Sequence, residues 1–579
     1  MFKLHSCPKS YTNDLDKACP PEFTVKNVSS ILKQFGTEIL FELKRIDTGR
    51  LGIPVYMSIC GHRAKQLMPS RKQMGKGSSP AQAKASALME LVERFSFFYF
   101  EQNYNFELLT YTDAKKKFPE VLPVEEILRS VQEDLNQEQA ITLLDLVQWK
   151  FVPSLDINTE TTIYLPFNWF KLLNEYNGSS AGNSYEESIL QGLCELIERH
   201  VCAIIEDEKK IVPTLNPASF NDPILKQLWT KFINNGIKVW LKDFSLDFPV
   251  PTIAALAYDP KTFPHKSEIV FTAGTATSPA KAAIRALTEV AQLAGDFETK
   301  SSYEPSGLSK YNTLEELKWI IQGNTVNLNQ LPTIEQDDIY EELKLLSSKL
   351  QTKGFLSLSI DITHPKLQIP ANYNIIPGLK FRERTKAACL GLFIGRSIAE
   401  NEEPKLALKK LEVIAQIYPD KYFIPFFKGL IYLRSSQLQE AKKFFQQACI
   451  LPSPREERAL SLFYLAYSLS LTKNWSQIPP ILKEAIALSP EVKEYHNLLG
   501  VALFKQKKYE QALIYFKQAL KLDKGSAIDL ANIGMCYKNL GHNLQAALFL
   551  QQALELDPTL DFAQKALIDI KKNNQVNLF

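Results

Sequence analysis

The stretch that decides the fold of the first two-thirds of the chain is Ser86-Ala-Leu-Met-Glu-Leu-Val-Glu-Arg94. It lies within a predicted helix over residues 80–99. At about 100° per residue, Ser86, Glu90 and Glu93 share one face of this helix, and Arg94 lies at the edge of that face. The opposite face is apolar and holds Leu88, Leu91, Val92 and Phe95. This pattern predicts a helix that buries one side in a core and presents carboxylates from the other.

Two further helices carry the same kind of polar stripe. A helix predicted over residues 185–204 aligns Glu187, Gln191, Glu195 and Glu198, and one over residues 279–294 aligns Arg285, Glu289 and Gln292. A row of glutamates is usually a solvated face, but these rows contain few lysines at the i+4 positions that would pair with them. Unpaired carboxylates repel one another unless a cation lies between them. Mg²⁺, which takes carboxylate and phosphate oxygens, suits such a site.

The segments around these helices predict a mixed architecture. Strand-like runs occur at residues 161–165, 237–241, 268–272 and 355–360, and turns rich in Gly and Ser precede the three acidic helices at residues 75–80, 177–183 and 273–279. Strands that alternate with helices in this way indicate packed layers of both elements. The predicted fold class of residues 1–380 is therefore α+β (mixed α/β).

The three acidic helices together resemble the YcaO family. The resemblance rests on Ser86-x-x-x-Glu90-x-x-Glu93-Arg94 preceded by Gly75-Lys76-Gly77, on Asn177-Gly178 followed by Gly182-Asn183, Glu187, Glu195, Glu198 and Arg199, and on Arg285-x-x-x-Glu289-x-x-Gln292. Asp361 and the run Ile375-Ile-Pro-Gly378 resemble the closing strand and turn of the family. These motifs follow one another in the family's order across residues 50–380.

The resemblance implies an ATP site without a P-loop, in which several Mg²⁺ ions join the phosphates to clustered glutamates. When the family's site positions are transferred to this sequence one by one, the resemblance implies Glu90, Glu93, Glu195 and Glu198 as the Mg²⁺ ligands. The positions that contact ATP are Ser86, Asn183, Glu187, Arg285 and Glu289, and weaker candidates are Lys76, Arg94, Gln191, Arg199 and Gln292. Residues 70–77 do not form a Walker motif, because Ser70 and Gly77 stand where Gly and Ser or Thr are required.

The chemistry implied by the resemblance is activation of a backbone amide in a peptide or protein. A nucleophile adds to the amide carbonyl, the oxyanion attacks the γ-phosphate of ATP, and phosphate then leaves. A neighbouring Cys, Ser or Thr gives an azoline, external sulfide gives a thioamide, and an amine gives an amidine. No residue of this chain is assigned as a catalytic group beyond the ATP and Mg²⁺ positions.

The last third of the chain repeats with a period of 34 residues. Gly500, Ala512 and Ala519 recur as Gly534, Ala546 and Ala553, and earlier copies are marked by Ala466, Ala485, Gly429, Ala441 and Ala448. This is the period of tetratricopeptide (TPR) repeats, in which small residues let two helices of a hairpin approach closely. We predict a YcaO domain over residues 1–380, a linker over 381–402 and TPRs over 403–573.

The TPRs predict a protein partner or a protein substrate. A TfuA-like protein, an adenylating-like protein and a methylthiotransferase are all possible partners, and a homodimer is also possible. Ring-forming relatives typically end in a proline-rich tail, whereas residues 573–579 contain no proline, which weighs against an azoline product. The alternative function is a non-catalytic ATP-binding accessory protein for another modifying enzyme, such as a ribosomal-protein methylthiotransferase. A carboxylate-metal hydrolase acting on a nucleotide would explain the glutamates but not the TPRs.

The composition of the chain further limits which classes of partner are expected. The 579 residues carry 67 Lys and Arg against 64 Asp and Glu, a net charge of +3, which is too balanced to predict nucleic acid or an anionic membrane as the main partner. Residues 1–17 have no apolar run typical of a signal peptide, and no stretch reaches about 18 uninterrupted apolar residues. The eight cysteines include no C-x-x-C pair. We therefore expect reduced thiols and a cytoplasmic location.

Overall fold

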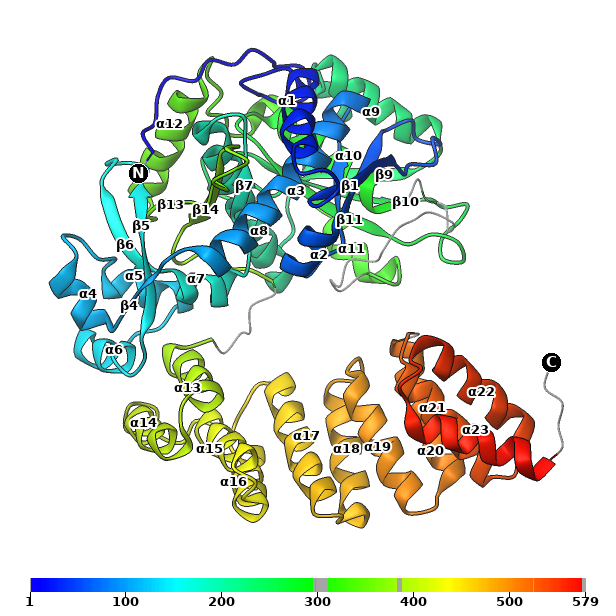
Figure 1. Ribbon diagram of the computed structural model, residues 1–579. Coiled ribbons are helices and arrows are strands. Elements are labelled where there is room, and N and C mark those ends of the chain that lie inside the picture. Colours follow the sequence, from blue (N-terminus) through cyan, green and yellow to red (C-terminus); the bar gives the residue numbers. More distant parts are fainter. Residues whose placement is uncertain (1, 295–296, 298–310, 383–387, 524, 575–579) are drawn as a thin grey trace. The chain divides into compact units, whose positions relative to one another are not determined.

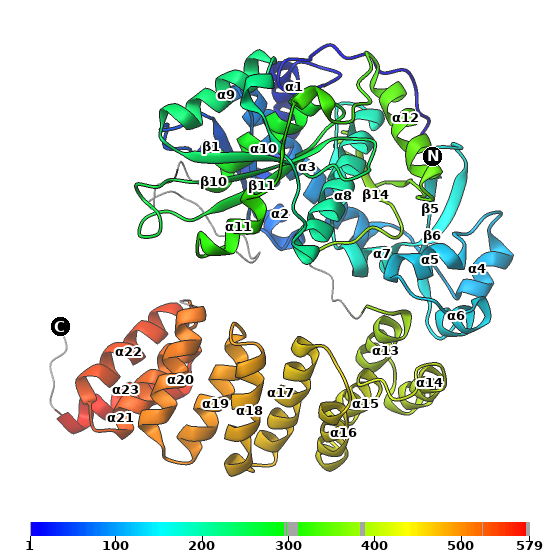
Figure 2. The same ribbon diagram turned by 180° about the vertical axis from the view of Figure 1, so that it is seen from behind.

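The computed structural model describes residues 2–294, 297, 311–382, 388–523 and 525–574. It divides into two units, residues 1–137 with 148–385 and residues 138–147 with 386–579. Figure 1 shows helices and sheets in the first unit and paired helices in the second, and Figure 2 shows the same elements from behind. In the described residues, no helix combines the length and the apolar composition needed to span a membrane.

Three sheets frame the first unit. One has the antiparallel order β1-β2-β3, one the order β11-β10-β9-β8-β12, and one the order β4-β5-β13-β14-β7 with β6 paired to β5. The strands are β1 (Leu40–Arg45), β2 (Val55–Cys60), β3 (Lys72–Lys76), β4 (Glu107–Leu109), β5 (Trp149–Asp156), β6 (Thr162–Pro166), β7 (Ser179–Ala181), β8 (Thr214–Leu215), β9 (Lys238–Asp243), β10 (Thr252–Tyr258), β11 (Val270–Thr275), β12 (Thr325–Val326), β13 (Leu358–Asp361) and β14 (Ala371–Ile375). The mixed α/β fold class predicted from the sequence is confirmed.

The three acidic helices are α3 (Pro80–Asn103), α8 (Tyr185–Glu208) and α10 (Pro279–Ala294). α3 and α8 each extend four residues beyond the predicted ends, because apolar residues such as Phe100 and Ile205 remain buried in the last turns. Ser79 and Ser184 cap the N-terminal ends of α3 and α8 by accepting hydrogen bonds from the backbone N–H groups of Gln82 and Glu187. The remaining α-helices in the described part of residues 2–382 are α1 (Pro21–Lys33), α2 (His62–Leu67), α4 (Tyr111–Lys117), α5 (Val124–Val131), α6 (Gln137–Leu144), α7 (Phe167–Asn174), α9 (Pro223–Asn234), α11 (Lys318–Ile321) and α12 (Ile339–Thr352).

A glycine brings each acidic helix against the strand or turn that precedes it. A Cβ atom at Gly75 would lie 2.0 Å from the backbone of α3, and at Gly182 or Gly274 it would lie 2.5 Å from the backbone of α8 or α10. Real Cβ atoms essentially never approach other atoms so closely. These three positions therefore fix how near the helices lie to β3, β7 and β11.

The apolar faces of the acidic helices build the cores of the first unit, as the sequence predicted. Leu88, Leu91, Val92 and Phe95 of α3 are fully buried with residues of α1 and β2. The apolar face of α8 packs against α12. The apolar face of α10 packs against β9, β10 and α9. With these faces buried, the opposite faces of the helices are left to carry the carboxylates.

Residues 390–574, within the second unit, form a row of helical hairpins. Its helices are α13 (Leu390–Asn401), α14 (Pro404–Ile417), α15 (Phe423–Arg434), α16 (Leu438–Ile450), α17 (Arg455–Leu471), α18 (Ile478–Leu488), α19 (Lys493–Lys505), α20 (Tyr509–Leu522), α21 (Ala527–Asn539), α22 (Asn543–Leu556) and α23 (Asp561–Asn574). A Cβ atom at Gly429 or Gly500 would lie 2.6 or 2.7 Å from the ring of Phe445 or Phe516. The small residues thus allow the close approach within each hairpin that the repeat predicted.

The linker expected over residues 381–402 differs from the structure. Residues 390–401 form α13, which packs against α14 and α15, and residues 383–387 lie outside the described part. A Cβ atom at Gly395 would lie 2.8 Å from the ring of Phe427. Gly395 and Ala407 stand 34 residues before Gly429 and Ala441, so the first hairpin continues the repeat to its N-terminal side. The helical row therefore begins about a dozen residues earlier than predicted.

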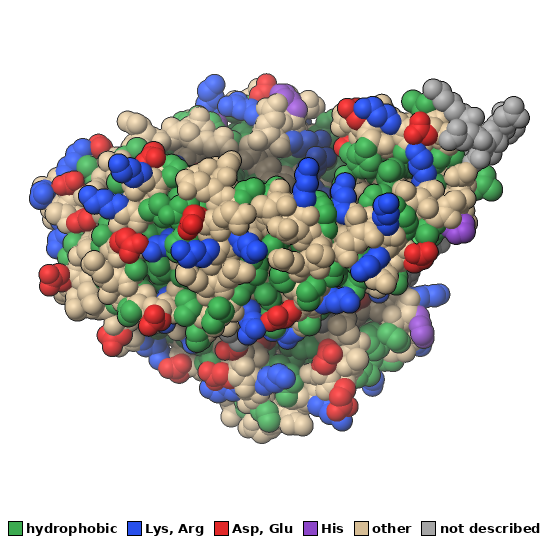
Figure 3. Space-filling model, turned by 90° about the horizontal axis from the view of Figure 1, so that it is seen from below, with side chains coloured by type: hydrophobic (Ala, Val, Ile, Leu, Met, Phe, Trp, Pro, Cys, Tyr) green, Lys and Arg blue, Asp and Glu red, His purple; other side chains and the backbone are tan. Residues whose placement is uncertain are grey.

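The charges of the surface are mixed, in agreement with the near-balanced composition. Figure 3 shows basic and acidic side chains interspersed with apolar ones over the face that it displays. Interspersed charges of both signs favour solubility more than attraction to a polyanion.

Candidate functional site

One cavity of about 250 Å³ lies where α3, α8 and α10 present their polar faces. Every site residue named from the sequence lines this cavity: Lys76, Ser86, Glu90, Glu93, Arg94, Asn183, Glu187, Gln191, Glu195, Glu198, Arg199, Arg285, Glu289 and Gln292. The structure therefore brings together residues that are more than 200 positions apart in the chain. Their roles toward a ligand are treated below as proposals.

The carboxylate of Glu93 on α3 is held from two sides. Ser179 of β7 donates a hydrogen bond from its hydroxyl to Glu93 Oε1 at 2.7 Å, and Arg94 Nη1 lies 2.8 Å from the same oxygen. The Arg94 guanidinium also lies 4.0 Å from the centre of the Tyr176 ring. These contacts hold Arg94 near β7 and beside the Glu93 carboxylate.

The carboxylates of α8 are held differently along the helix. Glu187 is only 4% exposed and accepts hydrogen bonds from Asn183 Nδ2 at 3.0 and 3.1 Å. Glu195 lies 3.6 Å from Arg199, one turn further on. Glu198 accepts from the backbone N–H of Thr275, at the end of β11, at 2.9 Å.

α10 contributes a cation and an ion pair. Arg285 Nη1 donates to Gln191 Oε1 at 2.6 Å, which ties α10 to α8 across the cavity. The Nε atom of Arg285 is buried and has no hydrogen-bond partner among the residues that the structure describes. Glu289 forms an ion pair with Lys76 from β3, a residue that the sequence ranked only as a weaker candidate.

Several carboxylates in the cavity are in surroundings that disfavour their charged form. Burial raises the pKa of Glu90 and Glu198, and it raises the pKa of Glu93 to about 8. Glu195 adds to the rise at Glu93 and at Glu90, while Arg94 partly offsets it. Burial also lowers the pKa of Lys76 to about 8. These shifts indicate clustered acidic groups whose negative charge costs free energy unless a cation joins them.

The residue types that line the cavity suit Mg²⁺ and phosphate, although among the described residues no three acidic, His or Cys side chains are already arranged to hold a metal ion. Four carboxylates on α3 and α8 offer the hard oxygen ligands that Mg²⁺ prefers. The side chains of Lys76, Arg199 and Arg285 line the same cavity and are suited to phosphate oxygens.

Sequence reasoning missed the contribution of the N-terminal segment. Asp14, Leu15, Lys17, Cys19 and Thr24 also line the cavity, although the motifs begin near residue 50. Thr24 donates from its hydroxyl to Asn183 Oδ1 at 2.9 Å. Residues 14–24 carry no periodic or motif signal, because their place at the site depends on tertiary contacts.

Comparison with family models identifies the first unit. Residues 74–380 match the family described as YcaO cyclodehydratase, ATP- and Mg²⁺-binding, and this match covers more than half of the chain. The chain belongs to the YcaO family. Its cofactors, ATP and Mg²⁺, are those expected from the sequence, and residues 494–526 and 530–560 match tetratricopeptide repeats.

Relatives of the YcaO domain include two uncharacterised proteins. One from Methanothermobacter thermautotrophicus is 28% identical over 63% of this chain and 95% of its own length. One from Rhizobium leguminosarum bv. trifolii, described as lying in the tfuA 3′ region, is 23% identical over 63% of this chain and 89% of its own. Among solved structures, a heterocyclase in complex with substrate and cofactor aligns with a TM-score of 0.52 and 21% identity. That alignment covers 68% of this chain and 57% of the heterocyclase, and it supports the YcaO fold alone.

Proposed function

We propose that this YcaO protein uses ATP and Mg²⁺ to activate backbone amides of a peptide or protein by phosphorylating the amide oxygen. The observation that supports this most is a single cavity lined both by four carboxylates of α3 and α8 and by five cationic side chains: Lys17, Lys76, Arg94, Arg199 and Arg285. A scaffold that bound no nucleotide would have no need of carboxylates whose pKa is raised by burial beside one another.

Within this proposal, each polar helix has its own task. Glu90, Glu93, Glu195 and Glu198 hold Mg²⁺, and Ser86, Asn183, Glu187, Arg285 and Glu289 bind the nucleotide. Gln191 orients Arg285, and Ser179 with Arg94 orients Glu93, so that the charged groups are fixed before a ligand arrives. When bound, ATP supplies the transferred phosphoryl group and Mg²⁺ supplies charge neutralisation.

The TPR hairpins are proposed to hold the substrate protein or a partner enzyme. One relative is described as lying in the tfuA 3′ region. A TfuA-like partner would point to thioamide formation with external sulfide as nucleophile, so this is the product class to test first. Azoline and amidine products remain the alternatives, and mass spectrometry of a treated peptide distinguishes all three.

The decisive experiment measures nucleotide binding and turnover on the full chain. Binding is followed with a fluorescent ATP analogue, with and without Mg²⁺, and turnover is followed as phosphate release with candidate peptides, sulfide and partner proteins. Mg²⁺-dependent binding together with substrate-dependent phosphate release supports an amide-activating enzyme. Binding without phosphate release under any of these conditions supports the accessory-protein alternative, and absence of binding rejects both.

Binding of Mg²⁺ with ATP is expected to release protons. A carboxylate must be ionised to bind the metal, but without metal the pKa of Glu93 is raised to about 8. Below about pH 8 the metal therefore displaces a proton from Glu93, and the apparent affinity falls by up to about tenfold for each pH unit of acidification. Above about pH 8 this group adds no further dependence.

Calorimetric titration in two buffers of different ionisation enthalpy counts the released protons. Glu93→Gln should reduce the number released near pH 7, whereas Glu208→Gln, at the exposed C-terminal end of α8, should leave it unchanged. Equal proton release by the wild type and Glu93→Gln would contradict the metal role assigned to Glu93.

A further inference from the structure

Residues 2–20 form a segment, here called the strap, that lies before α1 and outside the region matched by the family model. Four of its residues, Asp14, Leu15, Lys17 and Cys19, line the cavity of the proposed nucleotide site. The strap also makes polar contacts with the entry of every acidic helix. These contacts make it the strongest candidate for an unassigned functional element.

The entry of α3 is bound through Asp14. Its Oδ2 atom accepts a hydrogen bond from the backbone N–H of Ser78 at 3.1 Å and another from the Ser78 hydroxyl. Ser78 lies in the turn between β3 and α3, directly before the capping residue Ser79. The Asp14 side chain is buried, and Ser78 is half-buried at the same cavity.

The entry of α8 is bound at several points. The backbone N–H of His5 donates to Glu186 Oε1 at 2.8 Å, and Cys7 Sγ lies 3.3 Å from the hydroxyl of the capping residue Ser184. Glu187 receives a hydrogen bond from the backbone N–H of Ala18 at 3.0 Å and an ion pair from Lys17 Nζ at 3.3 Å. Part of what orients the Glu187 carboxylate therefore comes from the strap.

The entry of α10 is bound through Lys281. Its buried ammonium donates to the backbone carbonyls of Thr12 and Asn13 at 2.6 and 2.5 Å. A single segment thus connects the N-terminal ends of the three helices that carry the proposed ATP and Mg²⁺ residues.

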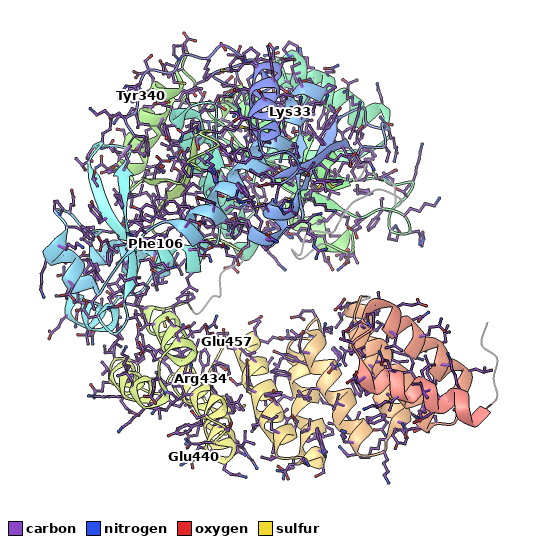
Figure 4. All side chains as sticks on the ribbon, in the orientation of Figure 1. Lys33, Phe106, Tyr340, Arg434, Glu440 and Glu457 are labelled. Carbon is purple, nitrogen blue, oxygen red and sulfur yellow. The ribbon has the colours of Figure 1, made fainter. Side chains whose placement is uncertain are left out.

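A buried ion cluster fastens the strap to α12. Lys9 Nζ lies 2.9 Å from Asp16 Oδ2 and 2.6 Å from Glu342 Oε1, and the three side chains are 3%, 9% and 0% exposed. Near the start of the same helix, Asp338 accepts a hydrogen bond from the backbone N–H of Cys7 at 2.9 Å. Figure 4 labels Tyr340 in this first turn of α12, two residues before Glu342. Because removing one partner of a buried ion pair leaves an uncompensated charge, this cluster is strongly coupled.

We propose that the strap is a working part of the nucleotide site, with Lys9, Asp16 and Glu342 as its latch and Lys17 as a positioning residue for Glu187. The inference rests on the proposed function, because it takes the cavity to be an ATP site. Release of the latch removes one wall of the cavity and frees the Glu187 carboxylate to leave its bound orientation. Nucleotide affinity therefore depends on a buried ion cluster whose residues are not themselves among the proposed nucleotide ligands.

The test compares Glu342→Gln with Glu341→Gln, a neighbour on α12 whose side chain is exposed. Loss of one charge-assisted contact in the latch is expected to weaken binding of the fluorescent ATP analogue with Mg²⁺ about tenfold or more. Hydrogen exchange should accelerate in residues 2–20 while the amides of α8 and α12 keep their wild-type protection. Glu341→Gln should match the wild type in both measurements.

A second variant avoids disturbing the buried cluster. Lys17→Met leaves the latch intact and should weaken nucleotide binding without faster exchange at residues 5–12, and Lys17→Arg should restore affinity. If Lys17 acts by positioning Glu187, then Lys17→Met should have little further effect in a Glu187→Gln background. An additive effect there would overturn the positioning role.

The outcomes separate this inference from the proposed function. If the wild type binds no ATP with Mg²⁺, the proposed function fails and this inference fails with it. If the wild type binds but Glu342→Gln and Lys17→Met bind equally well while residues 2–20 exchange faster in Glu342→Gln, the ATP site stands and the strap is not part of it.

Discussion

Glu195→Ala or Glu90→Ala is expected to reduce binding of ATP with Mg²⁺ by at least about a hundredfold. Each carboxylate lines the shared cavity, and Mg²⁺ gains most of its protein affinity from such oxygens. Loss of either one removes a ligand and leaves the phosphate charge less neutralised. The measurement is titration with a fluorescent ATP analogue at fixed Mg²⁺, followed by substrate-dependent phosphate release.

The matched control is Glu208→Ala, which removes an exposed carboxylate from the end of α8. Without metal, Glu90→Ala should unfold no more easily than the wild type, because burial raises the pKa of Glu90 and its charged form is therefore unfavourable in the folded state. With ATP and Mg²⁺, the wild type should gain thermal stability and Glu90→Ala should not. Near-normal affinity in both alanine variants would refute the assigned metal site.

Phe516→Ala in the TPR region is expected to destabilise its hairpin by about 3–5 kcal/mol. Phe516 is buried, and its ring fills the space opened by Gly500 of the facing helix. Loss of the ring leaves a cavity that neither α19 nor α20 can close, since both helices also pack against neighbouring hairpins. Urea unfolding followed by circular dichroism should show the first transition at a lower midpoint, because a repeat array can unfold locally.

Ile514→Ala is the control for this effect, since its side chain lies on α20 but is 57% exposed. Its expected change is within about 0.5 kcal/mol. If Phe516→Ala and Ile514→Ala shift the urea midpoint equally, the packing of the Phe516 ring does not stabilise this hairpin. ATP binding should survive in both variants, because the cavity is built from residues of the first unit.

The acidic helices could be predicted because each of their two faces shows residues of one kind at helical spacing. Apolar residues at helical spacing marked the buried side of α3, and carboxylates at the same spacing marked the side that lines the cavity. The small residues of the TPR hairpins were predictable for a similar reason, since a period of 34 leaves little freedom in their placement.

Other features escaped prediction for physical reasons. The strap has no period, because its contacts run from backbone groups and single side chains to distant helices such as α8 and α12. The sequence predicts a linker where α13 stands, although Gly395 and Ala407 continue the repeat, because residues 379–403 show no strand pattern and only these two positions mark the 34-residue period there. The ion pair between Lys76 and Glu289 also depends on β3 and α10 lying side by side, which local sequence cannot reveal.

Gly75, Gly182 and Gly274, which allow the acidic helices to lie close to the preceding strands, also bear on how homologues can be recognised. At Gly274 a Cβ atom would lie 2.6 Å from the Cβ atom of Arg285, so even an alanine there would displace the side chain that faces the cavity. This constraint is steric and acts whether or not a homologue still performs phosphoryl chemistry. A descendant that had lost its glutamates but kept the counterparts of Gly75, Gly182 and Gly274 would have inherited the scaffold while abandoning the reaction. In a distant homologue, the three glycines would therefore indicate shared ancestry, and the carboxylates would indicate retained activity. The two groups of residues should be examined separately when distant homologues are classified.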